Sequence, residues 1–117
     1  MKNTVKLNRE FTYAYRKGAK IVTDTMVFYF YKNRQSFSKL GLSVSTSLGK
    51  ANVRNRLKRL MRAAYFSRKA DIKDGYNIII VSRAKAKYVH FTKIQNDMDF
   101  CLEKSGILKW EKFFWKL

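Results

Sequence analysis

Arginine and lysine side chains crowd a short stretch in the middle of the chain, between Arg54 and Arg62. At roughly 100° per residue, a helix here would gather its apolar side chains into one stripe, made of Val53, Leu57, Leu60, Met61 and Ala64. The opposite side would carry Lys58, Arg59 and Arg62, flanked by Arg54, Asn55 and Arg56. Guanidinium groups grip phosphate oxygens in a bidentate fashion, so this side is suited to bind a phosphate-bearing polymer.

The same stretch lacks acidic residues, since none occurs from Arg54 to Lys69. A helix face that meets only water usually mixes Glu with Lys, because such pairs stabilise the helix at a spacing of four residues. Like charges at this density destabilise a helix until an anionic partner neutralises them. A solvated face is the plainer alternative, but the lack of acids favours contact with RNA.

The overall charge points to the same class of partner. The chain has 117 residues, with 26 Lys+Arg against 8 Asp+Glu, which gives a net charge of +18. Nucleic acid and an anionic membrane surface are the usual partners of such a chain. A hydrophobic content of 46% argues against a disordered basic tail. The length suits a single domain that spans residues 1–117.

Cysteine content and hydropathy indicate the cellular compartment in which the protein is expected. Cys101 is the only cysteine, which excludes an intramolecular disulfide and a Cys-rich zinc site. The first residues contain no apolar signal segment, and no stretch has the length needed to span a bilayer. We therefore expect a cytoplasmic protein that has no membrane partner.

The hydrophobic pattern predicts alternating helices and strands. In order, we expect a helix capped by Asn8 and ended by Gly18, strands at residues 21–31 and 40–46, a helix at residues 52–70, a strand at residues 76–82, and a helix that begins at a possible Thr92–Gln95 capping box and ends at Gly106. The apolar run at residues 78–81 is typical of a central strand. The order α-β-β-α-β-α, with a possible extra strand near residue 21, predicts an α/β (α+β) fold, a two-layer α-β sandwich.

Aromatic side chains offer a second kind of binding site. Phe11 and Tyr15 lie one turn apart on the first predicted helix, and Tyr29 alternates with Phe28 and Phe30, which we expect in the core. Unstacked bases could lie on these rings. The plainer alternative is that Phe11 and Tyr15 pack the helix onto the sheet.

Residues 49–62 read Gly-Lys-Ala-Asn-Val-Arg-Asn-Arg-Leu-Lys-Arg-Leu-Met-Arg, and here the sequence resembles the bacterial ribonuclease P protein family. The resemblance rests on the triplet Arg54-Asn55-Arg56 with Lys58, Arg59 and Arg62 behind it, the preceding residues 41–45, the pair Phe11 and Tyr15 followed by Gly18, and the Ile-rich strand ending in Arg83. These features span about residues 7–105. Tyr15 departs from the pattern, because the family often has Phe there; the change keeps a π-face and adds a hydroxyl.

The resemblance implies a ribosomal protein S5 domain 2-like fold, in which the arginine-rich helix joins two parallel strands by a left-handed βαβ crossover, against the usual handedness rule. It also implies a protein subunit of ribonuclease P that binds the catalytic RNA subunit and the single-stranded 5′ leader of precursor tRNA. Mg²⁺-dependent endonucleolytic removal of that leader gives mature tRNA 5′ ends. The RNA subunit would catalyse this step, with Mg²⁺ held mainly by the RNA subunit and the substrate and no small-molecule cofactor.

The resemblance also assigns residues to sites. Phe11, Tyr15, Tyr29 and Ser43 would bind the leader. On the helix, Lys58 and Arg62 lie roughly 140° to 180° from Val53, whereas Arg56 and Arg59 lie roughly 240° to 300° away. We hypothesise that the helix contributes Lys58 and Arg62 to leader binding, and that the RNA subunit is contacted by Arg54, Asn55, Arg56 and Arg59.

The remaining candidate residues predict no catalytic or metal site in the protein. His90 is the only histidine, and Cys101 falls at a core position of the last helix. Asp97 and Asp99 should point to different faces of that helix, whereas two-metal nuclease chemistry needs carboxylates that converge.

The tail, residues 107–117, goes beyond what the resemblance leads us to expect, because it carries Trp110, Phe113, Phe114 and Trp115 among lysines. We expect it to cap the sheet or a neighbouring helix, and an exposed amphipathic patch is the alternative. Two other functions stay open at this point. Composition and charge also fit a small ribosomal protein, and the basic helix with the aromatic tail could serve a peripheral membrane protein.

Overall fold

The computed structural model describes residues 4–5 and 8–109, and in this part of the chain helices and strands follow the predicted order. They are α1 (Asn8–Lys17), β1 (Ala19–Val22), β2 (Met26–Lys32), β3 (Lys39–Ser43), α2 (Ala51–Phe66), β4 (Tyr76–Ser82) and α3 (Phe91–Ser105), with short 3-10 turns η1 (Thr46–Leu48), η2 (Lys69–Asp71) and η3 (Ala84–Tyr88). The mixed α and β fold is therefore confirmed, and β1 is the extra strand predicted near residue 21.

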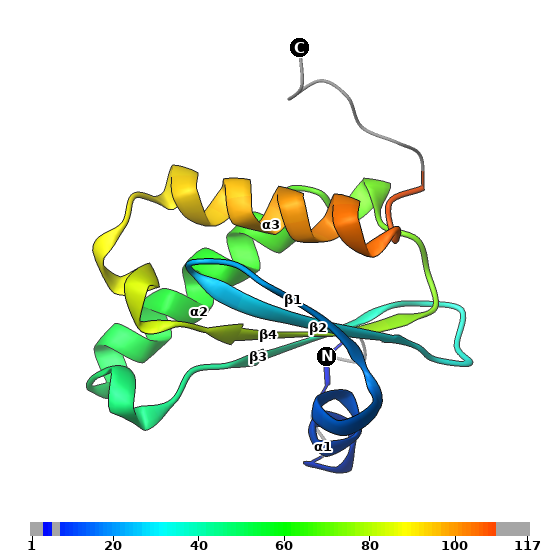
Figure 1. Cartoon of the computed structure of the whole chain (residues 1–117), viewed down its shortest axis with the longest axis horizontal. Helices are drawn as coiled ribbons and strands as arrows, with labels where there is room; N and C mark the ends of the chain where they lie inside the picture. The colour runs from blue at the N-terminus through cyan, green and yellow to red at the C-terminus, as the bar shows by residue number, and fades with distance from the viewer. Residues whose placement is uncertain (1–3, 6–7, 110–117) are drawn as a thin grey trace.

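The four strands form one sheet in the order β1-β2-β4-β3 (Figure 1). Strand β4 pairs antiparallel with β2 and parallel with β3, so α2 is the crossover that joins two adjacent parallel strands. The predicted central strand is confirmed, because Ile78 and Ile80 are buried in the core beneath α2 and α3 while Ile79 is buried on the other face. The left hand of the crossover stays a prediction from the resemblance.

Helices lie on both faces of the sheet. The predicted sandwich is formed by the sheet with α2 and α3, and α1 covers the opposite face as well. Figure 1 shows α2 and α3 on one side and α1 on the other. The larger core, on the α2 and α3 side, includes Met26, Phe28, Leu57, Met61, Ala64, Ile94, Met98 and Cys101. The smaller core, under α1, is formed by Val5, Ala14 and Ile79 with Phe11, Tyr29, Tyr31 and Val81 against it. The apolar stripe predicted for α2 thus faces the larger core.

Helix α2 ends at Phe66, four residues before the predicted end at Ala70. The Ser67 hydroxyl donates a hydrogen bond of 2.8 Å to the carbonyl of Ala64, which is a local bond that competes with helix continuation. The next residue, Arg68, turns towards α3 and binds Asp99 there. These contacts direct the chain into η2 and then β4.

Helix α3 begins at Phe91 with His90 as its N-cap, so the predicted Thr92–Gln95 capping box is wrong. The Gln95 amide nitrogen instead donates to the carbonyl of Ala64 at 3.2 Å and to Asp99 at 3.0 Å. The side chain that should have closed the box is therefore used to join α3 to α2. The predicted end is confirmed, since Gly106 is the C-cap with a positive φ of 78°.

The first residues of the tail pack against the segment between α2 and β4. Ile107 is fully buried, and Leu108 forms an antiparallel bridge with Ile72. The backbone of Lys73 donates to Ile107, and that of Lys109 donates to Asp71, both at 2.8 Å. The rest of the predicted cap, which includes Trp110, Phe113, Phe114 and Trp115, lies outside the described residues.

Candidate RNA-binding surfaces

The cationic side chains predicted for the middle helix lie together on α2. We call this surface the α2 cationic face and define it as Arg54, Asn55, Arg56, Lys58, Arg59 and Arg62. Asn55, Arg56, Arg59 and Arg62 are exposed, and Arg54 and Lys58 are half-buried. Leu57 and Met61, between them in sequence, are buried in the core. The helical period therefore separates the two sides as predicted.

Arg54 has a structural contact that the sequence did not suggest. Its Nε atom donates a hydrogen bond of 3.1 Å to the carbonyl of Gly49, in the turn just before α2. Gly49 has a φ of 149°, and a Cβ there would meet the Val53 side chain at 3.1 Å. Arg54 thus ties this glycine turn to the first turn of the helix, in addition to any role towards a ligand.

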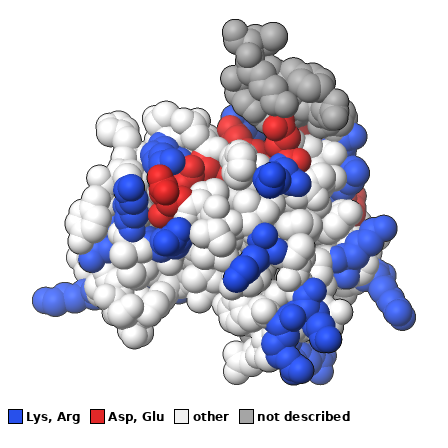
Figure 2. Space-filling model, viewed as in Figure 1, with Lys and Arg blue, Asp and Glu red and all other residues white. Residues whose placement is uncertain are grey.

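No acid among the residues that the structure describes compensates the α2 cationic face. Across residues 4–5 and 8–109, the ion pairs involve Lys39, Arg68, Lys85 and Lys93, and none of them engages a cation of this face. In the view of Figure 2, acidic side chains gather at the level of α3. The repulsion among the α2 cations is therefore left for an external anion to relieve.

Three aromatic residues that were predicted to bind the leader together meet on the other face of the sheet. The rings of Phe11 and Tyr15 lie 6.4 Å apart, and Tyr15 meets Tyr29 edge-on at 5.0 Å. We call these three the aromatic cluster. Tyr15 is exposed, with 44% of its surface accessible, while Phe11 and Tyr29 are half-buried. The rings of this cluster therefore pack against one another and still leave surface that a ligand could contact.

Gly41 makes room for the aromatic cluster. This role of the glycine was not predicted from the sequence. A Cβ at this position would lie 3.0 Å from the tip of the Phe11 ring and 2.9 Å from the Cβ of Val5. The missing side chain lets α1 approach β3 closely, so Phe11 reaches across the sheet to its edge. A glycine inside a predicted strand was the available signal.

The predicted leader residues fall into two groups separated by the sheet. Phe11, Tyr15 and Tyr29 lie on the α1 side, whereas Lys58 and Arg62 belong to α2, whose core residues pack on the opposite face. Ser43 is half-buried at the end of the edge strand β3, from which the chain continues towards α2. An RNA strand that contacted both groups would have to pass this edge.

Asp97, Asp99 and the cysteine have structural roles. Cys101 is fully buried, and burial, with a contribution from the charge of Asp97, raises the pKa of its thiol to about 12. Asp97 accepts hydrogen bonds from Thr25 and Lys93, whereas Asp99 accepts from Arg68 and Gln95. The two carboxylates therefore diverge, as predicted. Among the residues that the structure covers, no group of three or more His, Cys, Asp or Glu could hold a metal ion.

In the described part of the chain, no helix combines the length and the apolar character required to cross a lipid bilayer.

Comparison with known proteins gives a consistent family. A family model described as Ribonuclease P matches residues 1–106. The Ribonuclease P protein component of Clostridium botulinum is 34% identical over 106 residues, which cover 90% of this chain and 96% of that relative. The component of Oceanobacillus iheyensis is also 34% identical over 106 residues, covering 90% of this chain and 88% of the relative.

Solved structures agree with this result. The RNase P protein of Staphylococcus aureus superposes with a TM-score of 0.83 at 31% identity, covering 91% of this chain and 97% of that one. The RNase P protein of Thermotoga maritima superposes with a TM-score of 0.78 at 28% identity, covering 86% and 96%. The chain therefore belongs to the ribonuclease P protein family.

Proposed function

We propose that this chain is the protein subunit of a ribonuclease P that binds both the catalytic RNA subunit and the single-stranded 5′ leader of precursor tRNA, and so promotes removal of the leader. The observation that carries the proposal is the uncompensated α2 cationic face, since no described carboxylate pairs with its arginines. Membership of the ribonuclease P protein family indicates the enzyme in which this surface would bind RNA. We further propose that this occurs in the cytoplasm.

On the α2 cationic face, the proposed contacts to the RNA subunit come from Arg54, Asn55, Arg56 and Arg59. Exposed guanidinium groups can form bidentate bonds to phosphate oxygens, and each neutralised phosphate releases counterions. Because α2 is held rigidly by Leu57 and Met61 in the core, these side chains are presented on a fixed scaffold. Arg54 would contribute through its Nη atoms, because its Nε is already bonded to Gly49.

The proposed leader contacts combine stacking with phosphate binding, and they comprise Phe11, Tyr15, Tyr29, Ser43, Lys58 and Arg62. An exposed ring such as Tyr15 can accept any base on its face, which suits leaders of unrelated sequence. Ser43 offers a hydroxyl at the edge between the two groups. The leader would then run from the aromatic cluster past β3 towards Lys58 and Arg62.

Mg²⁺ would be held mainly by the RNA subunit and the substrate. The described residues include no group of three or more potential ligands that could bind it, and Asp97 and Asp99 of α3 accept hydrogen bonds from different neighbouring cations. Mg²⁺ prefers oxygen ligands and commonly takes them from phosphates. The contribution of the protein would be to bring phosphates together by neutralising their charge, which lowers the Mg²⁺ concentration needed for activity.

Reconstitution tests the proposal. The protein is mixed with a bacterial ribonuclease P RNA and precursor tRNA at limiting Mg²⁺, and leader removal is followed over time. We expect clear stimulation by the wild-type protein and a large loss of stimulation in Tyr15→Ala, which removes an exposed ring without opening the core. Exposed Lys104→Ala, on α3, is the matched control and should stimulate like wild type. No stimulation by the wild-type protein would defeat the proposal.

The division of α2 between two partners has its own test. Lys58→Glu with Arg62→Glu should weaken leader binding more than RNA-subunit binding, and Arg56→Glu with Arg59→Glu should do the reverse. Affinity for the RNA subunit is measured with the protein alone, and leader affinity is measured as the difference between precursor and mature tRNA binding by the assembled enzyme. Equal losses of both affinities from both double variants would refute the division.

A further inference from the structure

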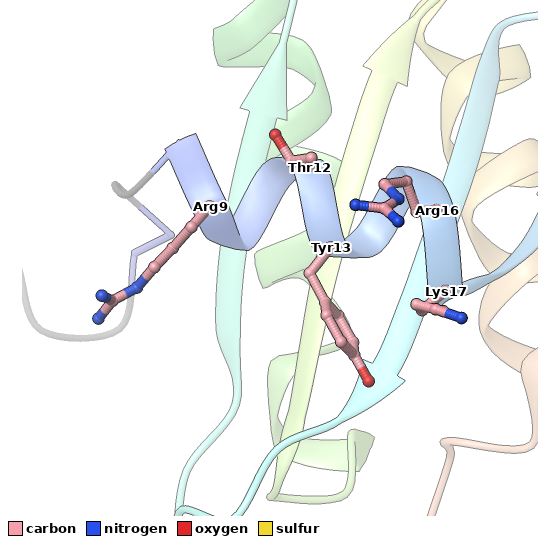
Figure 3. A pocket seen from close by; sticks show the side chains of 5 residues that line it. All are labelled: Arg9, Thr12, Tyr13, Arg16 and Lys17. Carbon is pink, nitrogen blue, oxygen red and sulfur yellow. The ribbon is translucent and has the colours of Figure 1, made fainter.

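Helix α1 lies across the sheet and separates two aromatic pairs. On one side Tyr15 meets Tyr29, and on the other Tyr13 meets Tyr31 with ring centroids 4.8 Å apart. Figure 3 shows α1 crossing the strands, with Tyr13 pointing to one side of the helix axis. The second pair is not part of the aromatic cluster, and neither of its residues is among the proposed leader contacts.

The second pair is held in place and partly open to solvent. The hydroxyl of Tyr31 accepts a hydrogen bond of 2.8 Å from the side chain of Asn77, which is itself buried. Tyr13 packs on the Tyr31 ring and keeps 51% of its surface exposed. A fixed ring beneath a half-exposed one is a suitable platform for a planar ligand, because little ordering is required on binding.

Cations surround this pair on the outer surface of α1. Arg9, Arg16 and Lys17 are exposed on the helix and Lys32 is exposed at the end of β2. The nearby acid, Glu10, is paired with Lys39 at 3.3 Å. No ion pair within the described ranges engages the four cations. In Figure 2, a group of Lys and Arg side chains (blue) lies at the bottom of the view, over α1, with no red among it.

Two adjoining depressions mark this surface. One, of about 350 Å³, is lined by Arg9, Thr12, Tyr13, Arg16 and Lys17 (Figure 3). The other, of about 370 Å³, is lined by Arg9, Glu10, Tyr13, Tyr31 and Lys32. Tyr13 and Arg9 line both, so an aromatic ring and a guanidinium group stand at the junction. Aromatic rings alternating with cations favour single-stranded nucleic acid, whose bases stack while its phosphates are neutralised.

We propose that the outer surface of α1 binds the upstream part of the leader, after the nucleotides nearer the cleavage site have crossed the aromatic cluster. The inference rests on the proposed function and extends it to longer leaders. Arg9 and Arg16 contact phosphates over the helix, and Tyr13 on Tyr31 receives a base beyond it. An α-helix with its side chains is only about 10 Å wide, so a few nucleotides suffice to cross α1.

The test compares leader lengths in the assembled enzyme. Precursor tRNAs with single-stranded leaders of about 4 and about 12 nucleotides are titrated with the holoenzyme, and the ratio of the two affinities is the readout. The wild-type enzyme should bind the longer leader about tenfold more tightly. Tyr13→Ala should abolish most of this gain and leave the affinity for the short leader unchanged. Arg9→Gln with Arg16→Gln, which leaves the Tyr13–Tyr31 contact intact, should abolish it as well.

The possible outcomes separate the two proposals. If the gain persists in both variants, or if wild type shows no gain, the inference is overturned, while stimulation with the short leader still supports the proposed function. Tyr15→Ala should weaken both leaders equally, and a loss restricted to the longer one would contradict the order in which the leader crosses the sheet. An enzyme that is not stimulated with either leader would defeat the proposed function itself.

Discussion

Helices α2 and α3 lie on the same face of the sheet, yet they handle charge in opposite ways. Helix α2 contains no acid, and its exposed cations have no carboxylate partner among the described residues. Helix α3 contains Asp97, Asp99 and Glu103, and the first two are paired with Lys93 and Arg68. Charges that hold the fold together are paired within the chain, whereas those left unpaired are available to an external polyanion.

The largest effect on folding is expected from Asp97→Ala. The buried Asp97 carboxylate accepts two hydrogen bonds from Thr25, one from the hydroxyl at 2.6 Å and one from the backbone nitrogen of Thr25 at 3.2 Å. The substitution therefore leaves two buried donors unsatisfied. The free energy of unfolding should fall by about 3 kcal/mol. Urea denaturation measures this, and the salt dependence of RNA binding should be unchanged. A change of less than about 0.5 kcal/mol would contradict a structural role for this carboxylate.

Arg59→Ala probes the opposite region. Arg59 is exposed and has no ion-pair partner among the described residues. The free energy of unfolding should therefore change by only a few tenths of a kcal/mol. RNA affinity should fall by about 2 kcal/mol, and the slope of log affinity against log salt should become shallower by about 1. Titrations at several salt concentrations measure both. An unchanged slope would remove Arg59 from the phosphate contacts.

Arg68→Ala gives the matched result for a paired arginine. Its Nε and Nη2 donate to the two oxygens of Asp99 at 2.8 and 2.9 Å, which joins the end of α2 to α3. Because the pair is partly exposed, we expect a loss of about 1 kcal/mol in the free energy of unfolding. The salt slope should stay that of wild type. A slope that became as shallow as in Arg59→Ala would show that pairing within the chain does not exclude RNA contact.

The smallest effect is a pH dependence of stability. Burial acts to raise the pKa of Asp97, but hydrogen bonds from Thr25 and Lys93 and the charge of Lys93 outweigh it and lower the pKa. A lowered folded-state pKa means that this stabilisation is present above the ordinary pKa of about 4 and is lost as pH falls below it. The free energies of unfolding of wild type and Asp97→Asn, measured between pH 6 and pH 2, should converge at the acid end. Parallel curves would contradict this assignment.

The order of elements could be predicted because each signal is local. The run of isoleucines in β4, the helical stripe that ends in Ala64 and the stop at Gly106 all act through neighbours in sequence. The predicted capping box failed for the opposite reason. Gln95 instead forms hydrogen bonds with Ala64 on α2 and with Ser67 just after the helix, and its neighbours in sequence do not reveal these partners. A tertiary contact thus overrode a local motif.

The sequence alone determined that α2 has an apolar side and a cationic side free of acids, since both follow from a fixed helical period and the absence of acidic residues within the helix. Only the tertiary structure decided that Tyr15 meets Tyr29 while Tyr13 meets Tyr31, and that Gly41 admits Phe11 at the sheet edge. Those contacts depend on strand order, register and the face on which α1 lies. Such long-range relations arise from packing the whole chain and are not encoded in the periodicity of any one segment.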